Sequence, residues 1–150
     1  MSIANKEVCG RFHELFRTGN IELARAVLAE DFVWRTPVRA QLSEATGAGA
    51  DRNGIVEFAA RLRAAFPDLQ FTVTNTLAQG DRVVAAWSFA GTHRGAWAGA
   101  AASGRPVRVA GINTLRICNG QVFEMWHHWD EMELLQQVDA MPPLPWGVRL

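Results

Sequence analysis

The chain has 150 residues, and its 15 basic side chains balance its 15 acidic ones, so the formal net charge at neutral pH is zero. A chain of this length forms one domain and buries roughly 70% of its unfolded surface, which leaves room for a cavity. A domain without excess positive charge has no electrostatic reason to bind nucleic acid or an anionic membrane. We therefore expect a small molecule as its ligand.

The N-terminal residues 1–10 have neither the basic segment nor the apolar run of a secretory signal. No stretch reaches the ~20 apolar residues of a membrane-spanning helix. Cys9 and Cys118 are distant in sequence and lie in apolar, periodic contexts, which favours buried, reduced thiols over a disulfide. Together these features predict a cytoplasmic protein.

The first part of the chain has helical periodicity. Apolar residues recur at helical spacing over residues 3–17, and a second such segment follows Asn20, which suits an N-cap, over residues 21–29. A short strand is predicted at Asp31–Trp34. Residues 35–51 are rich in Ala, Gly, Ser and Thr and predict a long loop of the kind that often borders a functional site.

The period then changes from helix to strand. A third helix begins at Asp51 or Asn53 and ends before Pro67, and strands with alternating apolar residues follow. Asn119-Gly120 is a strong hairpin signal. The remaining elements are strands over residues 71–79, 82–93, 105–118 and 121–129, a glycine-rich excursion over 91–104, a final helix over 131–138 and an irregular tail over 141–150.

Helices followed by meandering strands predict an α+β fold in which N-terminal helices pack on one face of an antiparallel sheet. Strands of ten or more residues twist strongly and, with bulges, curl. A curled sheet covered by helices forms a cone that encloses a pocket. We assign residues 1–150 to one such domain, with its core at about 7–140.

The segment 124–130 carries the densest set of functional side chains. In a regular strand, alternate residues share a face. Either face could line the cavity. The face that carries Glu124, His128 and Asp130 has three titratable groups, which makes it the better candidate for function. The first face carries Glu124, Trp126, His128 and Asp130, and the second carries Met125, His127 and Trp129.

Asp130 has two interpretations. It could be a general acid or base at the mouth of the cone, or it could cap the last helix, since Asp130 to Glu133 has the pattern of a capping box. Residue types alone slightly favour the cap. His127 and His128 point to opposite faces and cannot chelate one ion, so we expect no metal. His128 could polarise a carbonyl or be a half-exposed strand histidine, and His13 is expected to be solvated.

Several short motifs occur in a fixed order. They are Phe66-Pro67-Asp68-Leu69, Gly80-Asp81-Arg82-Val83-Val84, Gly91-Thr92-His93-Arg94-Gly95, Ser103-Gly104-Arg105-Pro106-Val107, the segment from Asn119 to Trp126, Asp130, and Leu134-Leu135-Gln136-Gln137. The ordered set closely resembles the SnoaL-like polyketide cyclase (ester cyclase) family of the NTF2-like superfamily. The resemblance extends from about residue 7 to residue 140.

The resemblance implies a cone-shaped domain without a cofactor that closes a polyketide ring by intramolecular aldol condensation. It places the family's acid/base aspartate at Asp130. The family's histidine, fourteen positions upstream, falls on Arg116 here, so Arg116, His128 or His93 could act in its place. Where many relatives have a histidine after the first strand, this chain has Trp34 followed by Arg35.

We thus expect an enzyme of cyclase, lyase or isomerase type that acts on a flat, carbonyl-rich molecule. Asp130 and His128 are the predicted catalytic residues. The predicted substrate-binding residues are Trp126, Arg116, His93, Thr114, Glu124 and Trp34.

Two alternatives stay open. The first is water-directed chemistry such as epoxide hydrolysis or hydroxylation, with Arg116, Asp130 and Glu124 holding the water. The second is a binding or interaction module without turnover. A homodimer or higher oligomer is expected through the outward strand faces. These faces carry Trp87, Phe89, Leu115 and Ile117, or the residues of opposite parity.

Overall fold

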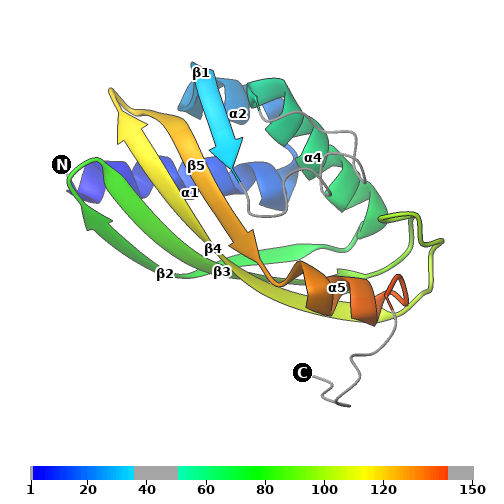
Figure 1. Cartoon of the computed structure of the whole chain (residues 1–150). Helices are drawn as coiled ribbons and strands as arrows, with labels where there is room; N and C mark the ends of the chain where they lie inside the picture. Colours follow the sequence, from blue (N-terminus) through cyan, green and yellow to red (C-terminus); the bar gives the residue numbers. More distant parts are fainter. Residues whose placement is uncertain (1, 36–50, 142–150) are drawn as a thin grey trace.

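A computed structural model describes residues 2–35 and 51–141 of the chain (Figure 1). Three helices precede most of the sheet, and one short helix follows it. They are α1 (Ser2–Thr18), α2 (Ile21–Val27), α4 (Arg52–Ala65) and α5 (Glu131–Gln137). The strands are β1 (Leu28–Arg35), β2 (Gln70–Gln79), β3 (Arg82–Thr92), β4 (Pro106–Cys118) and β5 (Gln121–Trp129). No helix among the described residues is long and apolar enough to cross a membrane.

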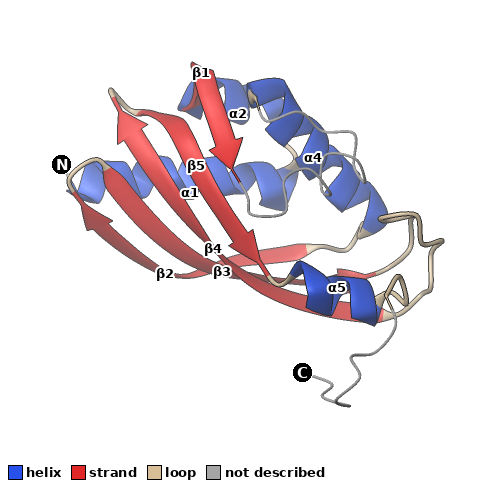
Figure 2. Ribbon diagram, viewed as in Figure 1, coloured by secondary structure: helices blue, strands red, loops and turns tan. Residues whose placement is uncertain are grey.

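The sheet has five strands in the order β1-β5-β4-β3-β2. It bends around α1, α2 and α4, which lie on its concave face, and its two edges do not meet (Figure 2). The predicted α+β class with helices on one face is therefore confirmed. In one respect the sheet differs from the expected antiparallel arrangement, because β1 pairs parallel with β5. A strand that precedes the meander can join its free edge in either direction, and here the turn from α2 into β1 sets the parallel one.

Local sequence signals place most element ends. Asn20 caps α2 by accepting a hydrogen bond from Leu23 N (3.1 Å), and Asp51 caps α4 in the same way through Gly54 N (2.8 Å). The Asn119-Gly120 pair has positive φ at both residues, as a tight hairpin with two central residues requires. The predicted loop at 36–50 and nearly all of the predicted tail lie outside the described residues.

The hydrophobic core lies between the helices and the concave face of the sheet. Trp87, Phe89, Leu115 and Ile117 are buried there, so the outward faces of β3 and β4 carry the opposite parity. In β2 a bulge at Thr74 shifts the alternation, which leaves Leu77 exposed. Leu77, Ile112 and Trp126 are large apolar side chains exposed on the strands. Self-association through the outward face stays a prediction.

Candidate functional site

Strand β5 separates two chemically different faces. Met125 and His127 are buried beneath the helices, and Trp129 is half-buried on the same side. His128 and Asp130 are exposed on the other side. The expectation that the face of Asp130 lines the hollow is therefore wrong. Helices α1 and α4 cover the opposite side of the strand, and an alternation of two residues cannot reveal in advance which side they cover.

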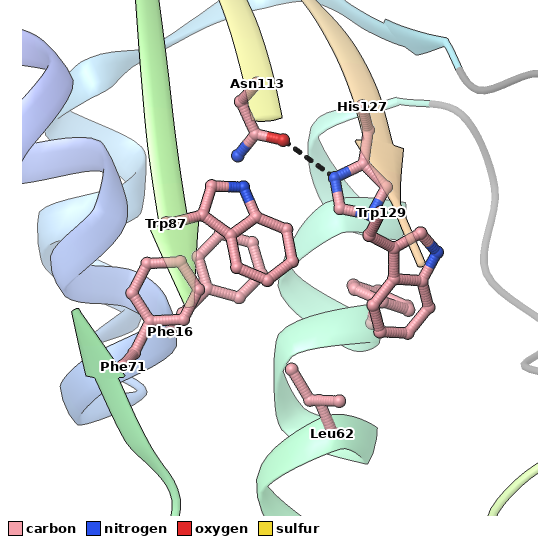
Figure 3. Close-up of a pocket in the computed structure, with 8 residues that line it drawn as sticks. Phe16, Leu62, Phe71, Trp87, Asn113, His127 and Trp129 are labelled. Carbon is pink, nitrogen blue, oxygen red and sulfur yellow. Dashed lines mark hydrogen bonds between the residues drawn. The ribbon is translucent and has the colours of Figure 1, made fainter. Parts of the chain in front are cut away.

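The inner face opens onto a hollow that we call the aromatic chamber (Figure 3). Its walls come from α1, α4, β2, β3, β4 and β5. The space between the side chains is about 10 Å³, enough for roughly one water molecule. A larger ligand therefore has to displace aromatic side chains. The lining residues are Phe16, Phe58, Leu62, Phe71, Trp87, Asn113, His127 and Trp129.

Two glycine-dependent features position the aromatic rings. Trp87 pairs across the strands with Gly111, and a Cβ added at Gly111 would lie 2.4 Å from Trp87 Cζ2 and 2.7 Å from the carbonyl oxygen of His128. Only glycine lets the indole lie flat against β4. The glycine-rich excursion folds into a tight turn at Ala98 and Gly99, both with positive φ, and this turn places Trp97 in the core.

The rings contact one another around the imidazole of His127. Trp87 stacks on His127 with a centroid distance of 5.8 Å and an interplanar angle of 10°. Trp129, Phe58 and Trp34 also lie against this imidazole, at centroid distances of 5.4, 6.2 and 6.1 Å. The imidazole therefore has apolar rings on several sides, and burial lowers its pKa to about 3.

A buried polar chain runs from α1 to β5 through the core. His13 Nδ1 lies 2.8 Å from the carbonyl oxygen of Cys9, and His13 Nε2 lies 2.9 Å from Asn113 Nδ2. Asn113 Oδ1 in turn lies 2.8 Å from His127 Nδ1. His13 is only 1% exposed, so the expectation that it is solvated is wrong. Burial lowers its pKa to about 4, partly offset by the bond to Cys9.

Several polar atoms near the chamber have no hydrogen-bond partner among the described residues. Three are indole Nε1 atoms, which only donate, and one is the outer imidazole nitrogen of His127. Buried polar atoms are normally paired, so such a set calls for an explanation. These atoms are Trp87 Nε1, Trp97 Nε1, Trp129 Nε1 and His127 Nε2.

His93 is a third buried histidine, but it does not line the chamber. Its Nδ1 accepts a hydrogen bond from Ser103 N (3.2 Å) and lies 2.9 Å from Ser103 Oγ. Nε2 therefore carries the proton, and it has no partner among the described residues. The imidazole packs on Phe66, at a centroid distance of 5.6 Å. Its predicted contact with substrate is untested.

Asp130 is the N-cap of α5, where its Oδ1 accepts a hydrogen bond from Glu133 N (3.1 Å). The capping interpretation is thus confirmed, and the carboxylate is exposed rather than dry. A half-buried neighbour, Glu131, has its pKa raised by burial. The catalytic role that the resemblance gives to Asp130 stays a prediction. The carboxylate does not have the dry, apolar surroundings that were expected for this role.

The other predicted residues of this face are engaged at the surface. Glu124 pairs with Arg35 (3.2 Å), whose guanidinium lies over the ring of Trp126. Trp126 is 42% exposed and stacks with His128. These side chains form an outer cluster that has no access to the aromatic chamber.

On β4, Arg116 and Thr114 alternate with the buried residues and so belong to the same outward side. Arg116 binds Asp81 (3.0 Å) and lies over the ring of Phe123. Arg116 therefore cannot take the place of the family's histidine in the interior. Arg116, Asp130 and Glu124 do not come together to hold a water molecule. Of the predicted binding residues, Trp34 is the one that contacts the His127 imidazole.

The profile described as SnoaL-like polyketide cyclase matches residues 6–138, which is most of the chain. The chain belongs to this family. A search among curated proteins gives no significant match.

Solved structures of several other proteins have the same fold as this domain. IdmH from Streptomyces antibioticus, a provisionally assigned polyketide cyclase, is 29% identical, with 90% of this chain and 98% of that chain covered and a TM-score of 0.76. AclR from Streptomyces galilaeus, a provisionally assigned hydroxylase, is 22% identical over 97% of this chain and 87% of that chain, with a TM-score of 0.80. Family membership supports a general role of the cyclase type for this SnoaL-like domain.

Proposed function

We propose that this SnoaL-like domain catalyses a cofactor-independent proton transfer within a flat, carbonyl-bearing small molecule, as in an intramolecular aldol ring closure. The observation that carries the proposal is the set of buried, unpaired polar atoms on the side chains in and beside the aromatic chamber. Indole N–H groups of Trp87 and Trp129 donate only, so they suit carbonyl oxygens. His127 Nε2 is the complementary acceptor.

His127 is the proposed base. Its pKa of about 3 keeps the imidazole neutral throughout the physiological pH range, with one ring nitrogen unprotonated, and makes it a weak base while the chamber is empty. A positive charge on a buried imidazole is unfavourable unless an anion forms beside it. An enolate next to Nε2 is such an anion. The negative charge that the proton transfer creates therefore stabilises the positive charge on the imidazolium.

The proposed reaction balances without a further reactant. His127 Nε2 takes the proton from the carbon between two carbonyl groups, which leaves an enolate. The enolate carbon attacks a second carbonyl carbon of the same molecule, so one carbon–carbon bond forms and the carbon–oxygen π bond opens. The resulting alkoxide takes the proton back from the imidazolium. General acid–base help of this kind contributes roughly 10²–10⁴-fold, and holding the chain in a reactive geometry adds to it.

The proposal requires the chamber to widen, since its present volume of about 10 Å³ is far below the ~300 Å³ of a typical ligand pocket. The first test is therefore binding. A hydroxyanthraquinone should quench tryptophan fluorescence in a saturable way, because four indoles lie in or beside the chamber, those of Trp34, Trp87, Trp97 and Trp129. No saturable binding up to millimolar probe would overturn the proposal.

The second test is turnover of a hydroxyanthraquinone that carries a β-ketoester side chain beside an aldehyde, followed by mass spectrometry and absorbance. We expect His127→Gln to lower kcat by about 10²–10⁴-fold. Asp130→Asn keeps a good cap and should retain most activity. Loss of turnover in Asp130→Asn with full activity in His127→Gln would reverse the assignment and restore Asp130 as the acid/base.

A non-catalytic binding module is the second candidate, and one observation favours it. Asp130, the group to which the resemblance assigns the chemistry, caps a helix and faces solvent. The same experiment separates the candidates. Saturable binding of the hydroxyanthraquinone without conversion of the aldehyde substrate would support a binding module.

A further inference from the structure

The hydrogen-bonded chain from Cys9 to His127 determines which ring nitrogens carry hydrogens, because the group at its start can only accept a hydrogen bond. The carbonyl oxygen of Cys9 only accepts hydrogen bonds, so His13 Nδ1, at 2.8 Å, has to carry a hydrogen. A neutral imidazole has one N–H group, and His13 is neutral because its pKa is lowered to about 4. His13 Nε2 is therefore a lone pair.

The same logic passes along the chain to His127. The lone pair of His13 Nε2 accepts from Asn113 Nδ2, which orients the amide with its oxygen toward β5 (Figure 3). Asn113 Oδ1 then accepts from His127 Nδ1, at 2.8 Å. Turning the amide over would set its oxygen against the lone pair of His13 Nε2, and the bond between these two residues would be lost. Only one arrangement satisfies all three bonds.

We propose that His13 and Asn113 are positioning residues that hold His127 in its Nδ1–H tautomer, so that Nε2 faces the ligand as a bare lone pair. The ligand group that this atom recognises is a donor, either a hydroxyl group or an acidic C–H. The use of that lone pair in catalysis rests on the proposed function, but the tautomer itself does not.

Burial makes this arrangement persistent. His13 and Asn113 are each 1% exposed and His127 is 3% exposed, so bulk water does not compete for these bonds. The hydrogen bond made by one ring nitrogen of a histidine determines whether the other ring nitrogen carries a hydrogen, as in histidines that bind metals. An amide does not readily pass a proton on, so Asn113 orients His127 without connecting it to a proton path.

The test is imidazole ¹⁵N NMR of the ligand-free protein, which distinguishes protonated from unprotonated ring nitrogens. In the wild-type protein we expect His127 to show a protonated Nδ1 and an unprotonated Nε2 between pH 6 and pH 8. His13 should show the same pattern. A protonated Nε2 on His127 would overturn the inference.

Two variants remove the constraint in different ways. Asn113→Leu removes both bonds of the amide. His13→Phe keeps a ring against Phe71, which stacks on His13 at 5.7 Å, and removes the acceptor for the amide together with the bond to the Cys9 carbonyl oxygen. Both should convert His127 to a mixture of tautomers. His128→Gln, one position away on the exposed face, is the control and should leave the tautomer of His127 unchanged. A role in packing alone predicts no change of tautomer, so an unaltered His127 in both folded variants would also overturn the inference.

Binding gives a second readout. Asn113→Leu should weaken binding of the hydroxyanthraquinone probe by roughly ten-fold, the effect of about one hydrogen bond. This result and the proposed function can fail separately. A wrong tautomer in the free protein overturns the positioning role and leaves turnover open. The expected tautomer without ring closure overturns the catalytic proposal and leaves the positioning role intact.

Discussion

The two faces of β5 carry adjacent histidines in opposite circumstances. On the outer face, His128 stacks on the exposed Trp126, and Asp130 caps α5. On the inner face, His127 is surrounded by aromatic rings and has an unpaired nitrogen. The outer polar groups are satisfied by neighbours or by solvent, whereas the inner ones are dry and incompletely paired. The comparison teaches that the number of titratable groups on a strand face does not predict which face is buried, because burial depends on which side of the sheet the helices cover.

The largest expected difference between the faces is in the response to acid. Burial lowers the pKa of His13 to about 4 and of His127 to about 3, from an ordinary 6.5. Below pH 6.5 the unfolded chain binds protons that the folded chain does not, so stability is complete above pH 6.5 and falls as the pH drops toward 4 and 3. At pH 4.5 the burial of His13 and of His127 should each lower the stability of the fold by about 2–3 kcal/mol.

Chemical unfolding at pH 7 and pH 4.5 measures this effect. His127→Gln should lose less stability between the two pH values than the wild-type protein, and His128→Gln should behave like the wild-type protein. Equal losses in wild type and His127→Gln would show that the inner histidine is hydrated, and the contrast between the faces would disappear.

The next effect concerns neighbouring positions on β4 that face opposite ways. Gly111→Ala places a methyl group against Trp87 and the backbone of His128, and should destabilise the domain by about 1–3 kcal/mol. Ala110→Ser, on the exposed side, should change stability by less than about 0.5 kcal/mol. Thermal unfolding compares the two, and a near-neutral Gly111→Ala would mean that Trp87 moves freely.

The smallest effect sharpens the role of Asp130. Asp130→Ala should cost about 1 kcal/mol through loss of the cap on α5, whereas Asp130→Asn should cost little, because asparagine caps as well. Thermal unfolding of both variants tests this. Similar losses in the two variants would indicate that the negative charge of Asp130, rather than its capping bond, stabilises the structure.

Much of the fold could be predicted because its signals are local. The caps Asn20 and Asp51 and the Asn119-Gly120 turn act within a few residues of themselves, so no distant part of the chain alters them. The parallel pairing of β1 with β5 was not predicted, because it depends on which sheet edge is free after the meander has formed.

The site was harder to predict, although two signals were present. Cys9, His13 and Phe16 recur at helical spacing, which places His13 on the apolar side of α1 rather than in water. Asn113 interrupts an alternation of buried aliphatic residues on β4, and an amide at such a position needs buried partners. Read together, these signals point to a polar chain in the core.

The sequence alone determined the family, the succession of helices and strands, and the division of β5 into two alternating faces. Tertiary structure alone decided which face became the interior. The alternation shows which residues share a face but not which of the two faces is buried. That choice depends on which side of the sheet α1 and α4 cover. That packing buried His127 and exposed Asp130, and it placed His13 and Asn113 within hydrogen-bond distance although they lie 100 residues apart.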